Sequence, residues 1–314
     1  MRAVLVVNPQ ATATTPAGRD VLAHALASQV KLDVVETDYR GHALIAAAAA
    51  AEEGADLVVA HGGDGTVNEV VNGLLAAGPS AVTPMLGVVP GGSANVFARA
   101  LGLPRNPVEA THVLLRAIEE GRGRRVGLGR VDFGASTSDD AAHRWFTFNA
   151  GMGWDADVVA DVDRRRGKRT GPGLYARSAL ARYLRPGRHR PDMTVQLPGA
   201  EPITGLRLAF VSNTDPWTYL GARPIHLNPD CGFDTGLGLF GLRTMRSTTV
   251  LRYIRQALSE QGVRGGKHLV RHDDVAKILV TAPEPVRLQC DGDLIGERTR
   301  VEFTAVPGAL TVAV

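Results

Sequence analysis

The stretch VAHGGDGTVNEVVNGLL, residues 59–75, decides how the first part of this chain is interpreted. An apolar run ends at Ala60, and a glycine-rich segment with one aspartate follows it at Gly62–Gly65. Apolar residues then recur at the spacing of one helix face, at Val67, Val70, Val71, Leu74 and Leu75. The stretch therefore predicts a strand, a tight turn and a helix. Residues Thr66–Glu69 fit a capping box at the start of that helix.

The sequence on both sides of this stretch repeats the same order of elements. Apolar runs rich in β-branched residues predict buried strands at 3–7, 32–36, 57–60 and 85–89. Periodic apolar positions predict helices at about 18–30, 42–53 and 94–101. Strands that alternate with helices indicate βαβ crossovers, so we expect an α/β N-terminal domain with a parallel sheet.

After about residue 125 the pattern changes to short strand-like runs separated by turns. These runs are 129–133, 144–149, 193–197, 205–213, 236–242, 276–282 and 286–292, with helical candidates near 172–184 and 248–260. Such a pattern favours a mainly antiparallel β-sandwich. The 314 residues therefore predict two domains, 1–124 and 125–305, with a C-terminal tail at about 306–314 that packs back on the first.

A second loop resembles the first in its small residues and its position. VVPGGSANVFARALGLP, residues 88–104, again passes from a strand into a helix, and Ser93 is the expected N-cap. The carboxyl ends of parallel strands and the amino ends of helices bind phosphate, and residues without a Cβ let it approach the backbone. Two such loops on neighbouring strands predict one polyphosphate site. The P-loop and dinucleotide-binding patterns are absent from the sequence.

The two loops, HGGDGTVNEVVNGL and VVPGGSANVFARALGLP, resemble the nucleotide loops of the diacylglycerol kinase catalytic domain family. This family contains soluble bacterial lipid kinases and is related to sphingosine and ceramide kinases. The resemblance extends to Asn8-Pro9, to the segment Phe148–Ala156 and to Asp291-Gly292-Asp293. It implies a Rossmann-like parallel sheet with the topology of NAD kinases and diacylglycerol kinases, followed by the β-rich domain.

The resemblance also implies an activity. Members of the family bind ATP and Mg²⁺ in the cleft between their domains and phosphorylate a lipid hydroxyl. Diacylglycerol is the expected acceptor, and phosphatidic acid the expected product. Asp64 is the residue implied for Mg²⁺ or for orienting the phosphates, and it counts among the catalytic residues. The residues implied for nucleotide binding are Asn8, Thr37, Gly62, Gly63, Asp64, Gly65, Thr66, Asn68, Glu69, Gly92 and Ser93.

Asp293 matches the position of the family's catalytic base, which is a glutamate in most members. Asp291 is a second candidate for that work. Phosphoryl transfer depends mostly on positioning and on charge stabilisation, so a shorter acid is compatible with the role. The family's Asp-Asp-Gly motif reads Asp234-Thr235-Gly236 here, so we do not expect its structural Mg²⁺ site.

Two other functions remain open from the sequence. An NAD kinase shares Gly-Gly-Asp-Gly and the Asn-Glu that follows, although the second loop fits the lipid kinases better. A nucleotide- or lipid-binding regulator could have lost catalysis through the altered acid at Asp293. Labelled ATP offered together with diacylglycerol separates these alternatives.

The segment Arg164–Arg190 holds ten Lys or Arg and no acidic residue, although the whole chain has a net charge of +3. This basic segment predicts an anionic membrane surface as partner, with residues 174–185 either as an interfacial helix or as a solvated helix whose apolar side is core. No nucleic-acid motif stands near it. The apolar runs are short and the two cysteines form no disulfide framework. We therefore expect a cytoplasmic protein, peripheral at the inner membrane face, and the sequence leaves a homodimer open.

Overall fold

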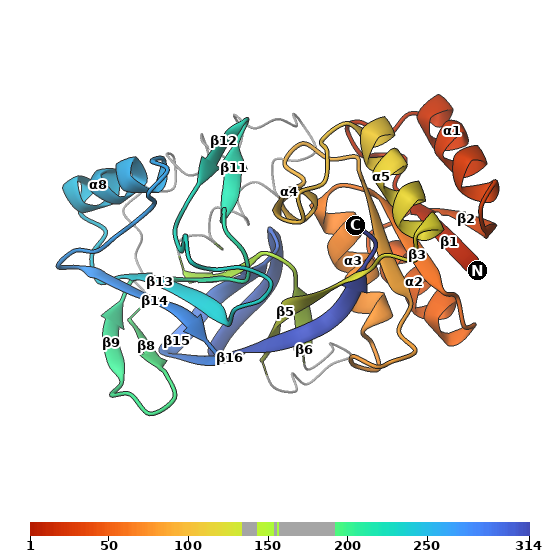
Figure 1. The fold of residues 1–314 in the computed structure, drawn as a ribbon. Coiled ribbons are helices and arrows are strands. Elements are labelled where there is room, and N and C mark those ends of the chain that lie inside the picture. Colours follow the sequence, from red (N-terminus) through yellow and green to blue (C-terminus); the bar gives the residue numbers. More distant parts are fainter. Residues whose placement is uncertain (134–142, 154–155, 157–191) are drawn as a thin grey trace. The chain divides into compact units, whose positions relative to one another are not determined.

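The computed structural model describes residues 1–133, 143–153, 156 and 192–314. The chain separates into two compact units (Figure 1). The first consists of residues 1–126 together with 308–314, and the second consists of residues 127–307. Within the described residues, no helix combines the length and the apolarity needed to cross a membrane.

The first unit is built on parallel strands, as its apolar runs predict. The strands are β1 (Arg2–Val7), β2 (Lys31–Glu36), β3 (Leu57–Gly62) and β4 (Met85–Pro90), in the order β4-β3-β1-β2. Both β1 and β3 are almost wholly buried, which is typical of parallel strands covered on both faces. The chain moves outward from β1 to β2 on one side and from β3 to β4 on the other. The carboxyl ends of β1 and β3 therefore form a topological switch point.

Five helices belong to this unit. They are α1 (Pro16–Ala27), α2 (His42–Glu52), α3 (Asp64–Leu74), α4 (Val96–Ala100) and α5 (Pro107–Glu119). The predicted apolar face of α3 is buried along its whole length. Helix α5 was not among the expected elements, although Asn106 caps its first turn and Pro107 occupies its first position.

The last residues of β16 (Asp293–Val312) complete the sheet of the first unit. Val312 pairs in parallel with Leu86 of β4, and the Ala313 amide donates to the Leu86 carbonyl at 2.8 Å. Arg125, at the start of β5 (Arg124–Asp132), donates from its guanidinium to the Gly308 carbonyl at 2.7 Å. Residues 308–314 thus belong to the first unit by hydrogen bonding as well as by contact.

The second unit is mainly antiparallel, which confirms the predicted change of class. Its central order is β14-β13-β10-β7-β15-β16, and every pairing between these neighbours is antiparallel. The strands not yet given are β6 (His143–Phe146), β7 (Asn149–Gly153), β8 (Met193–Gln196), β9 (Ile203–Leu206), β10 (Leu208–Ser212), β11 (Thr218–Leu220), β12 (Arg223–Ile225), β13 (Leu237–Leu242), β14 (Leu269–Val275) and β15 (Lys277–Cys290). Helix α8 (Ser247–Ala257) follows β13.

Several boundaries in this unit differ from the sequence expectation. The runs 276–282 and 286–292 form the single long strand β15 up to Cys290, with irregular pairing between Thr281 and Val286. The run 205–213 falls partly in β9, which pairs with β8, and partly in β10, which pairs with β7 and β13. The helix expected near 172–184 lies outside the described residues.

Candidate functional site

The loops that follow β1, β3 and β4 meet at the carboxyl edge of the parallel sheet. The Gly91 amide, after β4, donates to the Gly62 carbonyl, at the end of β3, at 2.7 Å. The Ala13 amide, from the loop after β1, donates to the Gly91 carbonyl at 2.8 Å. The two glycine loops singled out in the sequence are therefore neighbours, and the loop after β1 closes against them.

Close packing at the loops explains two of the glycines. A Cβ added to Gly62 would lie 2.6 Å from the Thr66 hydroxyl oxygen. A Cβ added to Gly92 would lie 2.6 Å from the Cα of Gly63, which belongs to the other loop. A side chain at Gly92 would push the two loops apart, and a side chain at Gly62 would collide with that of Thr66. The glycines thus bring two segments of backbone together.

Asn8 joins β1 to the first helical turn of α3 across the switch point. Its side-chain amide donates to the Thr66 hydroxyl at 3.0 Å, and its backbone amide donates to the His61 carbonyl at 3.0 Å. Thr37, at the end of β2, is buried, and its amide donates to the Val7 carbonyl. Both residues named for the nucleotide therefore stand at strand ends along the same edge.

The structure corrects the capping box expected at Thr66–Glu69. Helix α3 already begins at Asp64 after the N-cap Gly63, and no side chain caps it. The Glu69 carboxylate instead accepts hydrogen bonds from the amides of Gly41 at 2.9 Å and Ala43 at 3.2 Å. These amides start α2, whose N-cap Gly41 has no side chain. Glu69 is therefore the cap of the neighbouring helix, a role that sequence spacing cannot reveal.

The amino end of α3 offers the part of this site that a phosphate can reach. Gly65 is exposed, Gly63 and Asp64 are partly exposed, and nothing lies within 4 Å of a Cβ placed on Gly65. The amides and the dipole at a helix start favour an anion. Asn68 differs from these residues because it is fully buried, with its carbonyl and side-chain oxygens accepting from Asn72.

Asn95 closes the second loop, and the sequence analysis missed it. Its side chain accepts from the Gly92 amide at 2.9 Å and donates to the Gly92 carbonyl at 2.8 Å. Asn95 has a φ of 49° and is the N-cap of α4. The sequence analysis expected Ser93 in that position, but Ser93 is not the N-cap and is exposed. Asparagine tolerates this left-handed conformation better than most residues. The asparagine after Gly-Gly-Ser-Ala was therefore the feature of the sequence that could have indicated the turn.

Asp64 links the two loops through its carboxylate, because Oδ1 accepts from the Phe97 amide in α4 at 3.3 Å. The nearby His61 is buried in β3, and its Nδ1 lies 3.2 Å from the Val89 carbonyl. Burial lowers the pKa of the His61 imidazole below its ordinary value of 6.5. His61 is therefore neutral at pH 7 and donates to Val89, so it supports the strands and carries no charge beneath the loops.

In the second unit, Asp291-Gly292 is the two-residue turn between β15 and β16. Cys290 pairs with Asp293 across it, and both turn residues have positive φ, 48° for Asp291 and 81° for Gly292. Positive φ at both central residues is the mark of a type I′ turn, for which Asp-Gly is a preferred sequence. The motif is thus a hairpin tip that fixes the start of β16.

The Asp291 side chain is engaged by the turn between β6 and β7. Its Oδ2 accepts from the Thr147 amide at 2.6 Å and the Thr147 hydroxyl at 2.7 Å. Its Oδ1 accepts from the amides of Phe148 at 3.0 Å and Asn149 at 3.1 Å. Burial raises the pKa of the Asp291 carboxyl, whereas these hydrogen bonds favour its ionised form. The arrangement favours a positioning role for Asp291.

Asp293 lies in a different environment two residues later. Its side chain is 12% exposed, and Oδ2 lies 3.1 Å from a guanidinium nitrogen of Arg144 on β6. A buried chain of hydrogen bonds supports the hairpin beneath it, because Gln289 donates to Asn149 and accepts from the Gly292 amide. Arg144 was not named from the sequence, since it stands 149 positions before Asp293, and neither Asn149 nor Gln289 was named as a site residue.

Thr235 replaces a carboxylate with a hydroxyl that closes its own turn. Its Oγ1 accepts from the Gly232 amide and donates to the Gly232 carbonyl, both at 3.0 Å. In the part of the chain that the structure describes, no group of three or more His, Cys, Asp or Glu is placed to hold a metal ion. The basic segment 164–190, together with Trp154 and Asp155 of the expected motif, lies outside the described residues.

Comparison with known proteins gives a consistent result. The diacylglycerol kinase catalytic domain matches residues 2–131. A diacylglycerol kinase of Bacillus subtilis (strain 168) is 28% identical over 262 residues, covering 83% of this chain and 78% of that protein. The "Probable lipid kinase YegS-like" of Chromohalobacter salexigens is 31% identical over 267 residues, covering 84% and 78%.

Solved structures share the fold. A diacylglycerol kinase from Bacillus anthracis str. Sterne superposes with a TM-score of 0.72 at 19% identity, over 99% of this chain and 96% of that one. An NAD kinase from Archaeoglobus fulgidus, solved in complex with ATP, gives a TM-score of 0.54 at 13% identity, over 100% and 94%. The predicted relation to both topologies is therefore confirmed at the level of fold.

Proposed function

Because this chain belongs to the diacylglycerol kinase family of lipid kinases, we propose that it transfers the γ-phosphoryl group of ATP to the free hydroxyl of diacylglycerol. The observation that carries the proposal is the backbone-to-backbone contact of the two glycine loops, through Gly62, Gly63, Gly91 and Gly92. Packing accounts for these four small residues, whereas Gly65, whose Cβ would meet nothing within 4 Å, leaves the start of α3 open to a phosphate beside them.

In this proposal the nucleotide binds along the carboxyl edge of the first unit. The amides at Gly63–Gly65 donate to phosphate oxygens, and the dipole of α3 favours their negative charge. Asn8 and Thr66, which hold each other at 3.0 Å, fix the floor of the loop, while Thr37 and Ser93 stand at its two sides. Asn68 and Glu69 contribute indirectly, because Asn68 accepts from Asn72 within α3 and Glu69 caps the neighbouring helix α2.

The residues present suit Mg²⁺ that enters together with ATP. Asp64 is a partly exposed carboxylate at the mouth of the loops, oriented by the Phe97 amide. Mg²⁺ prefers oxygen ligands, and nucleotide sites hold it with one or two carboxylates and the substrate phosphates. The ion would neutralise charge on the phosphates. Asp64 would hold it and set the angle of the terminal phosphate.

The second unit supplies the acceptor side of the reaction in this proposal. Asp293 accepts the proton of the attacking hydroxyl, Arg144 orients the carboxylate, and Asp291 fixes the hairpin that carries it. A carboxylate is a weak base near neutral pH, but the transition state of phosphoryl transfer is loose and needs little proton removal. Positioning therefore contributes more to the rate than basicity does.

The proposal is tested by incubating the purified protein with γ-labelled ATP, Mg²⁺ and mixed micelles of diacylglycerol. Labelled phosphatidic acid is the expected product. A parallel panel offers sphingoid bases, glycolipids, a polyprenol and NAD under the same conditions. Preferred turnover of another lipid would change the acceptor and keep the kinase, whereas turnover of NAD alone would refute the lipid assignment. ATP binding without any turnover would leave a nucleotide-binding regulator.

A further inference from the structure

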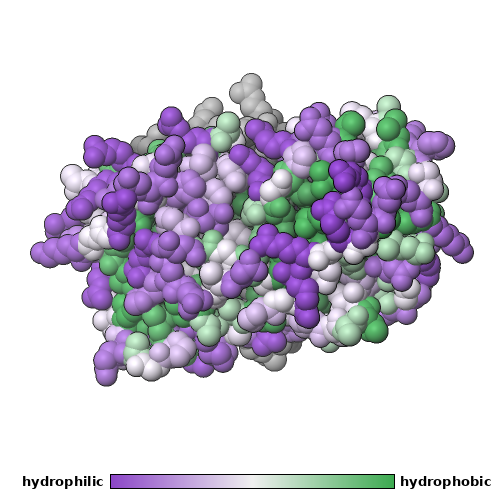
Figure 2. Space-filling view, viewed as in Figure 1, coloured by the Kyte–Doolittle hydropathy of each residue, from purple (hydrophilic) through white to green (hydrophobic). Residues whose placement is uncertain are grey.

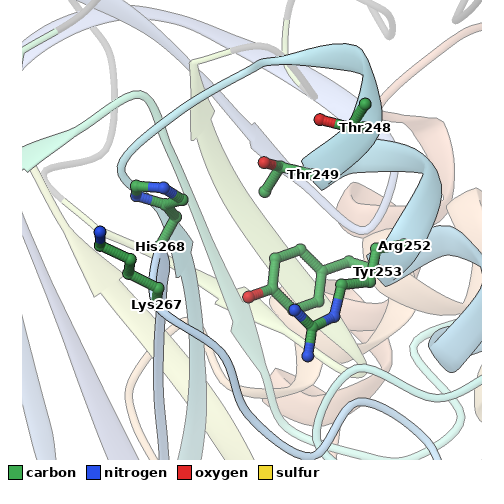
Figure 3. A pocket seen from close by; sticks show the side chains of 6 residues that line it. All are labelled: Thr248, Thr249, Arg252, Tyr253, Lys267 and His268. Carbon is green, nitrogen blue, oxygen red and sulfur yellow. The ribbon is translucent and has the colours of Figure 1, made fainter.

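A cavity beside α8 belongs to none of the sites described above. Its volume is about 210 Å³, and the residues that line it are Thr248, Thr249, Arg252, Tyr253, Lys267 and His268. Figure 3 shows the first four of them on α8 and the other two on the segment that faces the helix. One water molecule needs roughly 15 Å³ of such a volume, so the cavity has room for a larger solute.

The cavity lies at the far end of the second unit's sheet from the proposed base. The segment that carries Lys267 and His268 leads directly into β14, whereas Asp293 begins β16. Strands β13, β10, β7 and β15 lie between β14 and β16 in the strand order. The cavity is therefore separate from the place where the acceptor hydroxyl is proposed to react.

Close packing fixes the walls of this cavity. A Cβ added to Gly266 would collide with the Tyr253 hydroxyl, so a glycine lets this backbone segment reach the tyrosine ring. The Arg243 amide donates to the His268 carbonyl at 2.9 Å. The Tyr253 ring packs edge to face on Phe240, with 6.3 Å between the ring centres. Backbone and core contacts thus hold both sides of the cavity in place.

The Tyr253 hydroxyl is a hydrogen-bond donor that lacks a protein acceptor. Tyr253 is 4% exposed, and no hydrogen bond joins its hydroxyl to any of the described residues. Figure 3 shows this hydroxyl directed toward the segment with Lys267 and His268, on the other side of the cavity. Buried hydroxyls nearly always have a hydrogen-bond partner, so this one indicates an acceptor atom inside the cavity.

The charged side chains around the cavity are cationic. Arg252 and Lys267 are both positive, and no carboxylate of the described residues lines the cavity. Neither cation forms an ion pair within the part of the chain that the structure describes, and the Arg252 guanidinium lies 6.0 Å from the centre of the Tyr253 ring. Cations that are not neutralised favour an anionic ligand, and a guanidinium matches the oxygen geometry of phosphate.

The first turn of α8 adds neutral donors to these charges. The helix begins at Ser247 after the N-cap Arg246, and no side chain caps it. Thr248 and Thr249 stand in this turn and line the cavity with the positive end of the helix dipole. A helix start alone is an ordinary feature of a fold. Here it accompanies two cations and a buried hydroxyl without an acceptor around one volume.

The exposed apolar residues of α8 lie on another side of the helix. Leu251 is 65% exposed and Ile254 is 49% exposed. At about 3.6 residues per turn, both lie on the flank opposite the one that carries Thr249, Arg252 and Tyr253. Figure 2 shows mainly hydrophilic residues on the face of the second unit around α8, at the left of the view. The apolar residues therefore cannot take an acyl chain attached to a phosphate in the cavity, and the cavity fits a soluble ligand better.

We propose that this cavity binds the phosphate group of a small, soluble phosphomonoester. Arg252 and Lys267 neutralise its charge, and the hydroxyls of Tyr253, Thr248 and Thr249 donate to its oxygens. The bound group joins α8 to the segment before β14, so it stabilises the second unit by mass action. This inference goes beyond the kinase function and does not depend on it, because the cavity takes no part in phosphoryl transfer.

The test is isothermal titration of the full chain with inorganic phosphate and with methyl phosphate, both of which should bind. Arg252→Gln with Lys267→Gln should raise each Kd about tenfold or more, because two charge-assisted contacts are lost. Tyr253→Phe removes one hydroxyl and keeps the ring, so the Kd should rise about three- to tenfold. The matched control, Arg255→Gln with Arg264→Gln, removes two exposed cations of the same segment that do not line the cavity, and its Kd should stay within about twofold.

Phosphate also suits the nucleotide loops, so a second measurement locates the bound ion. Amide hydrogen exchange with and without inorganic phosphate should show slower exchange in residues 247–253 and 266–268 of the wild type. The Arg252→Gln, Lys267→Gln variant should lose this protection. Protection confined to residues 62–66 would place the phosphate at the nucleotide loops and overturn the proposal.

The remaining outcomes are equally decisive. An unchanged Kd in the Arg252→Gln, Lys267→Gln variant would overturn the proposal, and so would an equal loss in the control, which would reveal diffuse attraction only. Vesicles of phosphatidylglycerol that bind through Arg252 and Lys267, with no binding of methyl phosphate, would overturn the soluble ligand. Thermal melting without phosphate checks that each variant is folded. A failed lipid-kinase assay would leave this inference standing, and absent phosphate binding would leave the proposed function standing.

Discussion

At the residue scale, Asp291 and Asp293 show how two identical side chains acquire different roles from their surroundings. Asp291 is buried and accepts four hydrogen bonds from residues 147–149. Asp293 lies one pair further down the hairpin, faces Arg144 and remains partly exposed. The sequence identified both residues but could not separate them, because the donors lie more than 140 positions away.

Asp291→Asn should therefore act on stability. Asparagine offers one acceptor oxygen and a donating amide, so the donors that face the other Asp291 oxygen lose their partner. Unsatisfied buried donors cost about 1 to 3 kcal/mol each, and we expect a loss of about 2 to 5 kcal/mol. Urea unfolding measures it. Wild-type stability in this variant would show that the four hydrogen bonds contribute nothing.

Asp293→Asn should act on turnover instead. The amide nearly preserves the shape of the side chain but neither accepts the hydroxyl proton nor attracts Arg144, so kcat should fall about 100-fold or more. KM for ATP should remain within about a factor of three, because the nucleotide loops are unchanged. Urea unfolding on the same samples should give a midpoint close to that of the wild type. A variant with undiminished kcat would remove Asp293 from the mechanism.

His61 predicts a pH dependence of stability. Its folded-state pKa lies below the unfolded value of 6.5, so both states are neutral above that pH. As the pH falls through 6.5 toward the folded pKa, the unfolded chain binds the proton first and the wild type loses stability. The loss is about 1.4 kcal/mol for each unit of pKa difference.

His61→Asn keeps a donor near the Val89 carbonyl and removes the titration. The difference in unfolding free energy between wild type and variant should therefore change between pH 7 and 5, in the direction of relative gain for the variant. Parallel curves for His61→Asn and the wild type would contradict the assignment of a neutral buried imidazole.

At the scale of elements, the sequence predicted the strands and helices of the first unit because their apolar periodicity is strong. The sequence misassigned helix caps that depend on contacts between elements. Glu69 satisfies a capping box by spacing, yet it caps α2 through Gly41 and Ala43. Ser93 fits an N-cap by residue type, yet Asn95 takes that place. Helix α5 was not predicted, although Asn106-Pro107, an N-cap residue followed by proline, is a recognised start signal for a helix.

The two glycine loops give a prediction that separates folding from binding. Gly65→Ala should leave stability unchanged or raise it by up to about 1 kcal/mol, because its Cβ meets open space and alanine favours the helix. The same methyl group stands where the proposed phosphates approach, so the Kd for ATP should rise about tenfold or more. Isothermal titration and thermal melting measure the two effects.

Gly92→Ala is the matched comparison. Its Cβ would lie 2.6 Å from the Gly63 Cα, so both stability and ATP affinity should fall. A Gly65→Ala protein that binds ATP as tightly as the wild type would place the phosphates elsewhere, however stable it proved.

At the scale of the whole molecule, the change from alternating elements to short turn-separated runs predicted two classes of structure, and both are present. The long strand β16 escaped prediction because its first half is polar and charged, in the run GERTRVE. Its apolar end, ALTVAV, packs with residues far earlier in the chain, so local pattern alone gave no reason to join the two.

Because the last residues of β16 belong to the first unit, a substitution there should destabilise the first unit. Leu310 is 2% exposed and belongs to the first unit, so Leu310→Ala should cost about 2 to 5 kcal/mol there. Amide hydrogen exchange should accelerate in β4, the strand that pairs with the end of β16. Leu288→Ala, equally buried in β15, is the control and should accelerate exchange in the second unit. Faster exchange in the second unit alone for Leu310→Ala would contradict the assignment of residues 308–314.

The pairing of Val312 with Leu86 also sets an order of events during synthesis. A ribosome produces β1 to α5 first, yet the strand beside β4 emerges only after all of residues 127–307. The edge of β4 that pairs with Val312 therefore has no partner strand while residues 127–307 are being translated. The sheet of the first unit therefore gains its last strand only after the second unit has been synthesised.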